Sequence, residues 1–360
     1  MNVPKLRFLN FNNDYEIKEI SDITYNVSSG KISKQLEDGE YNVYGSMGII
    51  GKSNFYDYTG EKVLVARVGA NAGSVNKINE KCCISDNTLV LEPKNILNDY
   101  LYYSLSHYDP KKLIFGSGQP LVTGGQLKKI KLGVPSKEEQ VKVSNFLSLL
   151  DKKIELQSKK IEDLKLFKSY TKIRLFQNGD KTIKLGDILT KWNKKNKDGL
   201  IDYVESISNK FGFISQSDQF EDRNVASKDL KNYYVIEKNV FGYNPSRLNV
   251  GSLALKDNDN ISVVSPLYEC FTTNQNNKFM LEWFDSIYFK RGTLSRFEGG
   301  VRNTLNFTNL CEIEINLPSI ELQNKYATYL STLDKKIKFE EQKLNGLKNL
   351  KKGLMQNMFV

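Results

Sequence analysis

The chain has 360 residues, 39% of them hydrophobic, and its 52 Lys and Arg residues outnumber 42 Asp and Glu residues to give a formal net charge of +10. This length and hydrophobic content favour two globular units over a disordered chain, and the charge favours a polyanionic partner, although a Lys-rich solvated surface explains the charge equally well. A structural metal is not expected, because Cys82, Cys83, Cys270 and Cys311 lack zinc-site spacing and the chain has a single histidine.

Residues 1–14 are interpreted as an N-terminal arm. They lack the apolar core of a signal peptide, and no run of about 18 apolar residues occurs in the chain. We therefore expect a soluble, cytoplasmic protein without a membrane partner.

Residues 15–134 are predicted to form the first globular domain. Short β-like runs alternate with glycine-rich loops that begin near Gly45, Ala66 and Phe115. Glycines permit close approach of the backbone to a ligand, and the polar and basic residues beside them supply donors for phosphates and base edges. Ordinary hairpin turns explain the same glycines. The candidate DNA-contacting residues of this segment are Lys31, Ser46, Lys52, Arg67, Asn71 and Gln119.

This segment also contains two features that resemble enzyme sites. Ser46 to Ser53 reads SMGIIGKS, a near match to the phosphate-binding loop GxxxxGK[ST], but Ser46 replaces the first glycine and the following NFYDYTG predicts a turn without a helix to hold phosphate. His107 is the one candidate for histidine acid-base chemistry, and beside the turn-like Asp109-Pro110 it is predicted to be a surface residue. Neither feature supports catalysis by this chain.

Residues 135–179 are predicted to be a helical region. Ile130, Leu132 and Val134 alternate as in a strand before Pro135, and Ser136 then stands where a helix N-cap is wanted. No Pro or Gly interrupts the chain from there to Phe176. The apolar positions recur every seven residues, which predicts a helix with a packing seam. The seam residues are Leu147, Leu150, Ile154, Ile161 and Leu164.

Residues 180–317 are predicted to form the second globular domain. Its loops FGYNPSRLNVGSL from Phe241 and RGTLSRFEGGVRN from Arg291 mix arginines with aromatic and small polar residues. Guanidinium groups can pair with guanine or grip phosphate, although surface arginines are common. Asn244 to Arg247 resembles the start of an adenine methyltransferase NPPY motif but lacks its second proline and its aromatic residue. The candidate DNA-contacting residues here are Arg247, Asn249, Arg296 and Arg302.

Residues 318–360 repeat the helical region at an offset of 183 residues. Ile130–Gln177 and Ile313–Val360 are identical at 18 of 48 positions, and the second seam consists of Leu330, Leu333, Ile337, Leu344 and Leu347. Both seams are interrupted at equivalent places, by Gln157 and Glu340 and by Lys168 and Lys351, and such polar residues fix register. We predict an antiparallel coiled coil between two mixed α/β domains, in an α+β fold with a pseudo-two-fold repeat. Independent amphipathic helices and intermolecular dimerisation are the alternatives.

This arrangement resembles the specificity subunits of Type I restriction-modification systems. In each half a variable domain ends in a glycine-rich stretch, followed by a strand, a proline, a Glu-x-Gln sequence and an amphipathic helix with LDKKI. The sequence SGQPLVTGGQLKKIKLGVPSKEEQ, from Ser117 to Gln140, is especially typical. The second copy departs from the pattern, because Leu322 precedes Gln323 where Glu139 precedes Gln140.

The resemblance implies that each variable domain is a target recognition domain for one half of an interrupted DNA site. It also implies two modification subunits and restriction subunits as partners, with S-adenosylmethionine, ATP and Mg in those partners and no cofactor or catalytic residue in this chain. The helical regions would set the spacer and dock the modification subunits. The alternatives are a coiled-coil assembly adaptor that does not bind DNA and a piece of a fused restriction-methyltransferase, which would need catalytic motifs.

Overall fold

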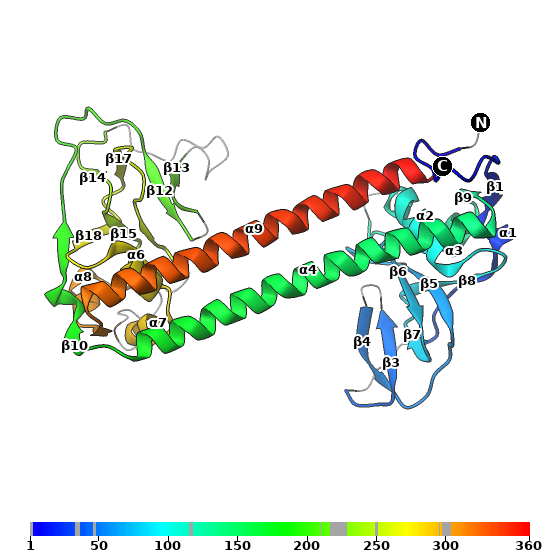
Figure 1. The fold of residues 1–360 in the computed structure, drawn as a ribbon, viewed down its shortest axis with the longest axis horizontal. Coiled ribbons are helices and arrows are strands. Elements are labelled where there is room, and N and C mark those ends of the chain that lie inside the picture. Colours follow the sequence, from blue (N-terminus) through cyan, green and yellow to red (C-terminus); the bar gives the residue numbers. More distant parts are fainter. Residues whose placement is uncertain are drawn as a thin grey trace. The chain divides into compact units, whose positions relative to one another are not determined.

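The computed structural model describes residues 3–32, 37–45, 48–114, 118–209, 211–216, 229–248, 251–294, 296 and 304–360. The chain divides into two compact units: unit 1 comprises residues 1–159 and 341–360, and unit 2 comprises residues 160–340. Two long helices, α4 (Lys137–Gln177) and α9 (Ile320–Met358), contribute residues to both units (Figure 1). Within the described residues, no helix is both long enough and apolar enough to cross a bilayer.

Unit 1 contains a main sheet, a smaller sheet and a strand pair. Its strands are β1 (Glu16–Glu19), β2 (Thr24–Ser29), β3 (Tyr41–Gly45), β4 (Gly48–Ser53), β5 (Glu61–Ala66), β6 (Val75–Asn79), β7 (Cys82–Ile84), β8 (Thr88–Pro93) and β9 (Lys131–Val134). Its shorter helices are α1 (Ile20–Ile23), α2 (Asn98–Tyr108), η1 (Pro110–Leu113) and α3 (Gly124–Lys128). The main antiparallel sheet has the order β2-β8-β5-β6, the smaller sheet has the order β4-β3-β7, and β1 pairs with β9.

Unit 2 contains a main sheet and three strand pairs. Its strands are β10 (Lys181–Lys184), β11 (Leu189–Trp192), β12 (Glu205–Ser208), β13 (Gly212–Ser215), β14 (Tyr234–Ile236), β15 (Phe241–Tyr243), β16 (Leu253–Leu255), β17 (Ser262–Val264), β18 (Glu269–Thr273) and β19 (Glu314–Leu317). Its shorter helices are η2 (Leu185–Asp187), α6 (Asn277–Phe284), α7 (Ile287–Leu294) and α8 (Phe307–Cys311). The main sheet has the order β11-β18-β15-β16, and the pairs are β10-β19, β12-β13 and β14-β17.

The two units share one structural frame. The strand order β2-β8-β5-β6 of unit 1 recurs as β11-β18-β15-β16 in unit 2. In each unit the last of these strands in chain order, β8 or β18, is followed by a helix, α2 or α6. A short capped helix, α3 or α8, comes later, and after it a strand that pairs with the first strand of the unit. Strands β3, β4 and β7 and their counterparts β12, β13, β14 and β17 occupy the same places in chain order but pair differently. The units therefore differ in what is inserted into the frame.

Each long helix begins at the predicted serine. The backbone N–H of Gln140 donates to the carbonyl oxygen of Ser136 at 3.0 Å, and Gln323 and Ser319 repeat this bond at 2.9 Å. Both glutamine side chains also bind the N-terminus of a domain helix. Oε1 of Gln140 accepts from Leu97 N–H before α2 at 2.9 Å, and Oε1 of Gln323 accepts from Asn276 N–H before α6 at 3.1 Å. The same residue thus fixes the same joint in both units.

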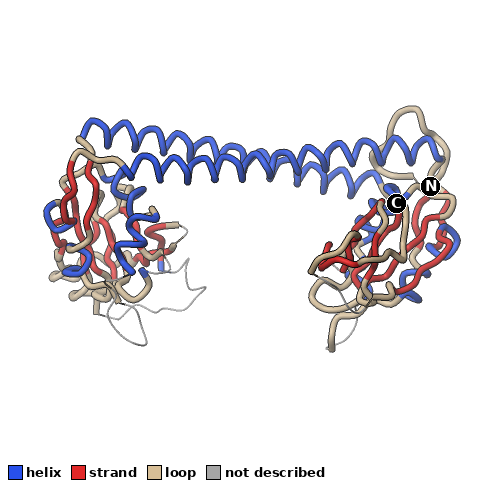
Figure 2. The backbone as a smooth tube through the Cα atoms, turned by 90° about the horizontal axis from the view of Figure 1, so that it is seen from below, coloured by secondary structure: helices blue, strands red, loops and turns tan. Residues whose placement is uncertain are grey.

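The long helices run antiparallel. In unit 2, Lys160 of α4 pairs with Glu340 of α9 at 2.7 Å, and Lys168 pairs with Asp334 at 2.7 Å, so that residue numbers rise on one helix as they fall on the other. In unit 1, Lys351 of α9 pairs with Asp151 of α4. Every residue of the two predicted seams is buried or partly buried. The predicted α+β fold, with an internal repeat and an antiparallel helix pair, is confirmed (Figure 2).

The end of each long helix places one buried aromatic ring in a unit core. Phe359, one residue beyond α9, contacts Tyr100 of α2 with ring centroids 5.5 Å apart in unit 1. Phe176 of α4 contacts Phe279 of α6 with centroids 5.4 Å apart in unit 2. Phe176 and Phe359 are equivalent in the 183-residue repeat. His107 stacks on Phe359 at 5.7 Å and is partly buried, so its predicted surface position is wrong.

We predict that Phe359→Ala destabilises unit 1 and that Phe176→Ala destabilises unit 2. Each change removes a buried ring and leaves a cavity, which costs about 3–5 kcal/mol in a protein core. Hydrogen exchange resolved by residue will detect the loss of protection in the affected unit. Both tryptophans, Trp192 and Trp283, lie in unit 2, so tryptophan fluorescence during urea unfolding should shift for Phe176→Ala. The reverse assignment of the two effects would contradict the packing.

Candidate nucleic-acid interface

The loop end of unit 1 brings together four chain segments that are distant in sequence. The hairpin loop of residues 67–74, between β5 and β6, lies against the segment 118–122 before α3. Gly69 N–H donates to the Pro120 carbonyl oxygen at 3.1 Å, and Val122 N–H donates to the Arg67 carbonyl oxygen at 2.8 Å. Residues 30–32 join through Lys31 N–H, which donates to Ile84 at 3.0 Å, beside the segment 84–88. Main-chain bonds therefore hold these loops in place.

Glycine is required in this hairpin loop. Gly69 and Gly73 have φ angles of +82° and +81°, in the left-handed region that favours glycine. A Cβ atom on Gly73 would lie 2.5 Å from the backbone nitrogen of Lys111. Gly73 thus has a packing role, whereas open space lies over Gly69.

Four of the predicted residues of unit 1 lie on this loop end. Lys31, Asn71 and Gln119 are exposed, and Arg67 is partly exposed. The Arg67 guanidinium is 3.5 Å from the Asp86 carbonyl oxygen, a separation at the limit of a hydrogen bond. These side chains can present amide, ammonium and guanidinium donors to one surface. Ser46 lies outside the described residues, and DNA contact by any of these residues stays a prediction.

Lys52 lies apart from the loop end, on β4 of the smaller sheet. Its ammonium donates to Oδ1 of Asn42 at 2.8 Å, and the Asn42 amide donates to Glu80 at 3.1 Å. The hydroxyl of Tyr44 also donates to Glu80, and burial together with this bond raises the pKa of Tyr44 to about 12. Lys52 is therefore part of a polar network across the strands.

The loop end of unit 2 has the same construction. The turn after β15 is closed by Asn244, whose Oδ1 accepts from Ser246 N–H at 3.0 Å, and it presents an exposed Arg247. Pro245 accepts from Leu305 N–H at 3.1 Å, just before α8, as Pro120 and Val122 contact the loop in unit 1. Arg247 thus occupies the hairpin that corresponds to that of Arg67 and Asn71. The predicted Asn249 and Arg302 lie outside the described residues.

Arg296 binds its own unit. Its guanidinium donates to the carbonyl oxygens of Gly292 at 2.9 Å and Glu312 at 3.1 Å, and its own carbonyl accepts from Asn309 at 3.2 Å. These bonds join the end of α7 to α8. A DNA contact by Arg296 stays a prediction, but its described bonds are structural.

In each unit a lysine connects the long helices to the domain helix, α2 or α6. The sequence pattern identifies this lysine only as a polar interruption of the seam. In unit 2, Lys168 donates to both Asp334 of α9 and Glu282 of α6, at 2.7 and 2.8 Å. In unit 1, the equivalent Lys351 pairs with Asp151, and Asp151 accepts from the hydroxyl of Tyr103 of α2 at 2.8 Å. The repeated aspartate of LDKKI could have indicated these partners.

The fastening of unit 2 is more ionic than that of unit 1. Lys172 adds contacts to Glu282 at 3.0 Å and to Asp285 at 2.7 Å. Burial disfavours ionisation of Glu282, but Lys172 and Lys168 outweigh it and hold the pKa of this carboxyl below its usual value. Glu282 is therefore charged at neutral pH and neutralises two lysines on one face of α4.

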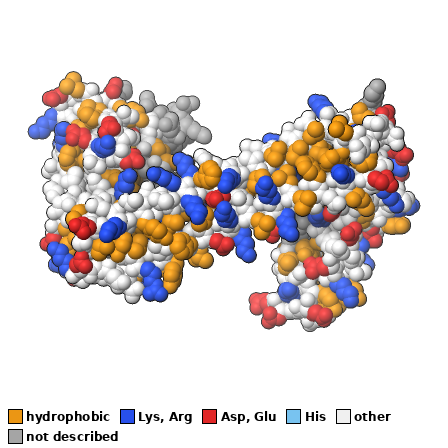
Figure 3. Space-filling view, viewed as in Figure 1, with side chains coloured by type: hydrophobic (Ala, Val, Ile, Leu, Met, Phe, Trp, Pro, Cys, Tyr) orange, Lys and Arg blue, Asp and Glu red, His pale blue; other side chains and the backbone are white. Residues whose placement is uncertain are grey.

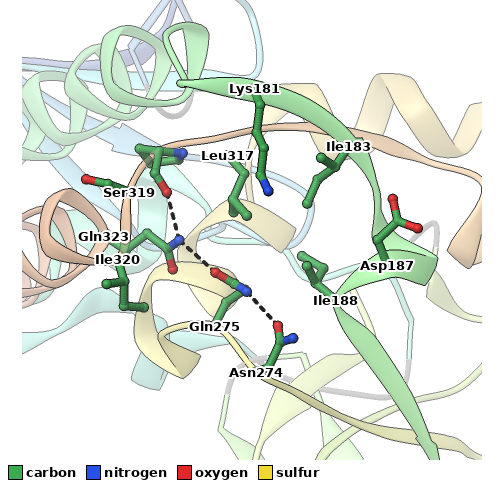
Figure 4. A pocket seen from close by; sticks show the side chains of 11 residues that line it. Lys181, Ile183, Asp187, Ile188, Asn274, Gln275, Leu317, Ser319, Ile320 and Gln323 are labelled. Atoms are coloured by element: carbon green, nitrogen blue, oxygen red, sulfur yellow. Dashed lines mark hydrogen bonds between the residues drawn. The ribbon is translucent and has the colours of Figure 1, made fainter.

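A cavity of about 490 Å³ lies where β10 and β19 meet the start of α9. Gln323 donates to the Pro318 carbonyl oxygen and to Gln275, both at 2.9 Å, and Gln275 donates to Asn274 (Figure 4). The polar side chains on the Gln323 side of the cavity are therefore hydrogen-bonded to one another. No group of three or more His, Cys, Asp or Glu side chains in the part of the chain that the structure describes is arranged to hold a metal ion.

The fold defines a duplicated protein, in which two copies of one frame each carry an exposed loop end and are fastened to a common helix pair. The family model of the Type I restriction modification DNA specificity domain matches residues 12–166 and 179–349. The chain belongs to this family and carries two copies of its domain.

Curated relatives agree with this assignment. A putative type I specificity subunit of Mycoplasma pneumoniae is 32% identical over 145 residues, which are 38% of this chain and 47% of the relative, so the chain spans about half the length of that protein. The MjaVIII specificity subunit of Methanocaldococcus jannaschii is 24% identical over 98% of this chain and 94% of the relative.

Solved structures show the same fold. The S subunit of a Type I restriction-modification system from M. genitalium has a TM-score of 0.65 and 16% identity, with 99% of both chains covered. A chain from a study of complex assembly and conformational transition of the type I R-M system has a TM-score of 0.58 and 12% identity, covering 95% of this chain and 96% of the other.

We predict that Glu282→Gln lowers the stability of unit 2 at pH 7 by about 1–3 kcal/mol, because two lysines lose their shared counter-charge. A carboxyl with a lowered pKa stabilises the fold above its ordinary value of 4.5 and loses this effect as the pH falls through its folded pKa. The variant should therefore lose less stability than the wild type between pH 7 and pH 3. Urea unfolding followed by tryptophan fluorescence measures both effects. Glu162→Gln, an exposed change on α4, is the control.

Proposed function

We propose that this chain is the non-catalytic DNA-specificity subunit of a Type I restriction-modification complex in the cytoplasm. Each frame acts as a target recognition domain for one half of an interrupted double-stranded DNA site. The helix pair sets the number of unspecified base pairs between the half-sites and docks two modification subunits. Restriction subunits complete the assembly.

The repeated loop end is the observation that carries this proposal. Two copies of one frame present corresponding hairpin loops, with Arg67 and Asn71 in one and Arg247 in the other, each supported by main-chain bonds to the segment before a short helix. A rigid frame with exposed polar loops is the usual arrangement for recognition. Basic side chains would fix register on phosphates, while arginine and amide groups read base edges in the grooves.

Cofactor chemistry is assigned to the partners. S-adenosylmethionine for adenine methylation, and ATP with Mg²⁺ for translocation and cleavage, would bind the modification and restriction subunits. This chain would position the target adenine for flipping into a partner's pocket.

We predict that Arg67→Ala and Arg247→Ala each relax recognition in a different half-site. Losing a guanidinium that contacts a base costs about 1–3 kcal/mol and weakens discrimination at that position. Binding of the purified complex to duplexes with permuted half-sites, at a fixed salt concentration, will measure this. Arg174→Ala is the matched control, since Arg174 lies on α4 with its guanidinium 5.4 Å from the Tyr170 ring. Equal effects of Arg67→Ala on both half-sites would contradict the assignment.

We also predict that lengthening both long helices lengthens the spacer. Seven residues inserted after Ser158 and after Gln342 preserve the heptad seam and extend each helix by about 10 Å, which equals about three base pairs. Sequencing of methylated bases in cells that carry the complete system should show unchanged half-sites and a longer spacer. Insertion into one helix alone should abolish methylation, because it breaks the register. A spacer of unchanged length would refute the role of the helices as a ruler.

An assembly adaptor that does not bind DNA is the competing function. Such a protein would show no DNA affinity that falls steeply with salt, whereas a protein that neutralises phosphates must show it. Titration of the complex with duplex DNA at several salt concentrations separates the two functions.

A further inference from the structure

Each unit carries a β-hairpin among the strands that are inserted into the common frame. In unit 1 this hairpin consists of β3 and β4, and in unit 2 it consists of β12 and β13, which occupy the same place in chain order. We call these two elements the insert hairpins. Because β3 also pairs with β7 and the two sequences differ, the properties that the insert hairpins share indicate a common role.

Both insert hairpins expose large apolar side chains at the tip. Ile49 and Ile50 follow the turn between β3 and β4 and are 57% and 45% exposed. Phe211 lies in the turn between β12 and β13 and is 67% exposed. We call these three residues the apolar tips. Figure 3 shows apolar side chains exposed among charged ones on the part of unit 1 that contains β3 and β4. Large apolar groups exposed to water at equivalent places indicate contact with another molecule.

A shift of strand register brings two apolar residues to the tip in unit 1. Ile49 pairs with Tyr44, whereas Gly51 pairs with Val43, and this leaves Ile50 as an extra residue in β4. An extra residue of this kind bends the strand and re-aims its side chains, and it occurs frequently beside functional sites. The local backbone therefore departs from a regular hairpin at the place where the apolar side chains are exposed.

Each apolar tip lies beside the loop end of its unit. In unit 1, the Ser85 N–H of the segment 84–88 donates to the carbonyl oxygen of Tyr44, at the end of β3, at 2.8 Å. In unit 2, a Cβ atom on Gly251 would lie 3.9 Å from Cγ of Asn209, so the turn between β12 and β13 lies against the loop that presents the exposed Arg247. The apolar tips are thus adjacent to the basic and amide side chains of the loop ends.

A carboxylate holds each insert hairpin in place. In unit 1, Glu80 accepts hydrogen bonds from two side chains of β3. In unit 2, Lys256 and Ser262 both donate to Glu205 of β12, and all three side chains are buried. Displacing the hairpin of unit 2 would leave a buried charge without its partner, which is strongly destabilising. The insert hairpins are therefore fixed on their units and can present their tips to a ligand with little loss of conformational entropy.

We infer that each apolar tip inserts between two base pairs of its own half-site and kinks the duplex there. This inference rests on the proposed function, under which each unit binds one half-site. Isoleucine and phenylalanine side chains share apolar bulk and have no hydrogen-bonding group, and proteins use such side chains as wedges that unstack a base step. An apolar tip beside cationic side chains is complementary to an apolar base stack that lies between phosphates.

Insertion makes the apolar tips determinants of specificity that form no hydrogen bond to a base. Pyrimidine–purine steps unstack and kink at a lower energetic cost than other steps. Each half-site should therefore favour a pyrimidine–purine step where the tip enters, in addition to the bases that polar side chains read.

The test measures DNA bending by the chain in complex with the modification subunits of its own system. Duplexes carry the recognised site, and a pair of fluorophores on either side of one half-site reports its bend by energy transfer. The double variant Ile49→Ala with Ile50→Ala should straighten the half-site of unit 1 by about 20° or more and leave the other half-site bent. Phe211→Ala should have the reverse effect. Each variant should weaken binding about tenfold in a fluorescence anisotropy titration, because apolar burial is lost.

The controls are exposed apolar residues at the opposite end of each insert hairpin. Phe55, which follows the far end of β4, is 60% exposed, and Ile261, which precedes the Ser262 that binds Glu205, is 51% exposed. Phe55→Ala and Ile261→Ala should keep both bends and the affinity of the wild type. Circular dichroism and urea unfolding of every variant verify that the units remain folded.

Each other outcome overturns the inference in a distinguishable way. If the tip variants keep the bends and the affinity of the wild type, the apolar tips do not contact DNA and the proposed function stands. If affinity falls while both bends persist, the tips touch the surface of a groove without insertion. If the tip variants lose a modification subunit, the tips bind protein. If the controls straighten the DNA as much as the tip variants do, the bend does not depend on the tips. If the wild-type complex binds no duplex, the proposed function fails as well.

Discussion

Each unit of this protein is completed by a helix end that belongs to the other sequence repeat. Unit 1 contains the start of the first helical region and buries Phe359 from the end of the second helical region. Unit 2 buries Phe176 from the end of the first helical region. Antiparallel pairing of α4 and α9 is what makes this exchange possible. Unit 1 therefore cannot close its core until residues more than 200 positions apart have met, since Tyr100 packs on Phe359.

This constraint explains why the helical regions stay similar while the domains diverge. Leu147 and Leu330 must fill the hydrophobic cores of units 1 and 2, and Gln140 and Gln323 must reach the start of a domain helix. Each of these residues has partners on two elements, so few substitutions satisfy all of them. The strands inserted into the frame are not constrained in this way by partners on both a long helix and a domain helix. Under the proposed function, recognition of different DNA sequences can therefore change in the inserts and loop ends without disturbing the joint with the helices.

Physical reasons separate what the sequence predicts from what it does not. The seven-residue period, the serine N-caps and the repeat predict the helix pair, because those signals are local and regular. The frame that the two units share cannot be predicted from the sequence, since equivalent positions hold chemically different side chains. The lysine–aspartate pair between the long helices, for example, binds Tyr103 in unit 1 and Glu282 in unit 2. Residue type also does not reveal side-chain partners. Arg67 and Arg296 are equally attractive by composition, yet Arg296 binds two carbonyl groups of its own unit.

The departure between the repeats at Glu139 and Leu322 has a similar origin. Glu139 is buried, accepts from the Arg7 guanidinium at 2.8 and 2.7 Å, and accepts from the Tyr15 hydroxyl at 2.9 Å. Burial and this bond raise the pKa of Tyr15, which stays neutral and donates. A carboxylate at this buried position needs the N-terminal arm, because an unpaired buried charge is strongly destabilising. The Leu322 position has no such arm before it, and an apolar residue is the physically consistent choice there.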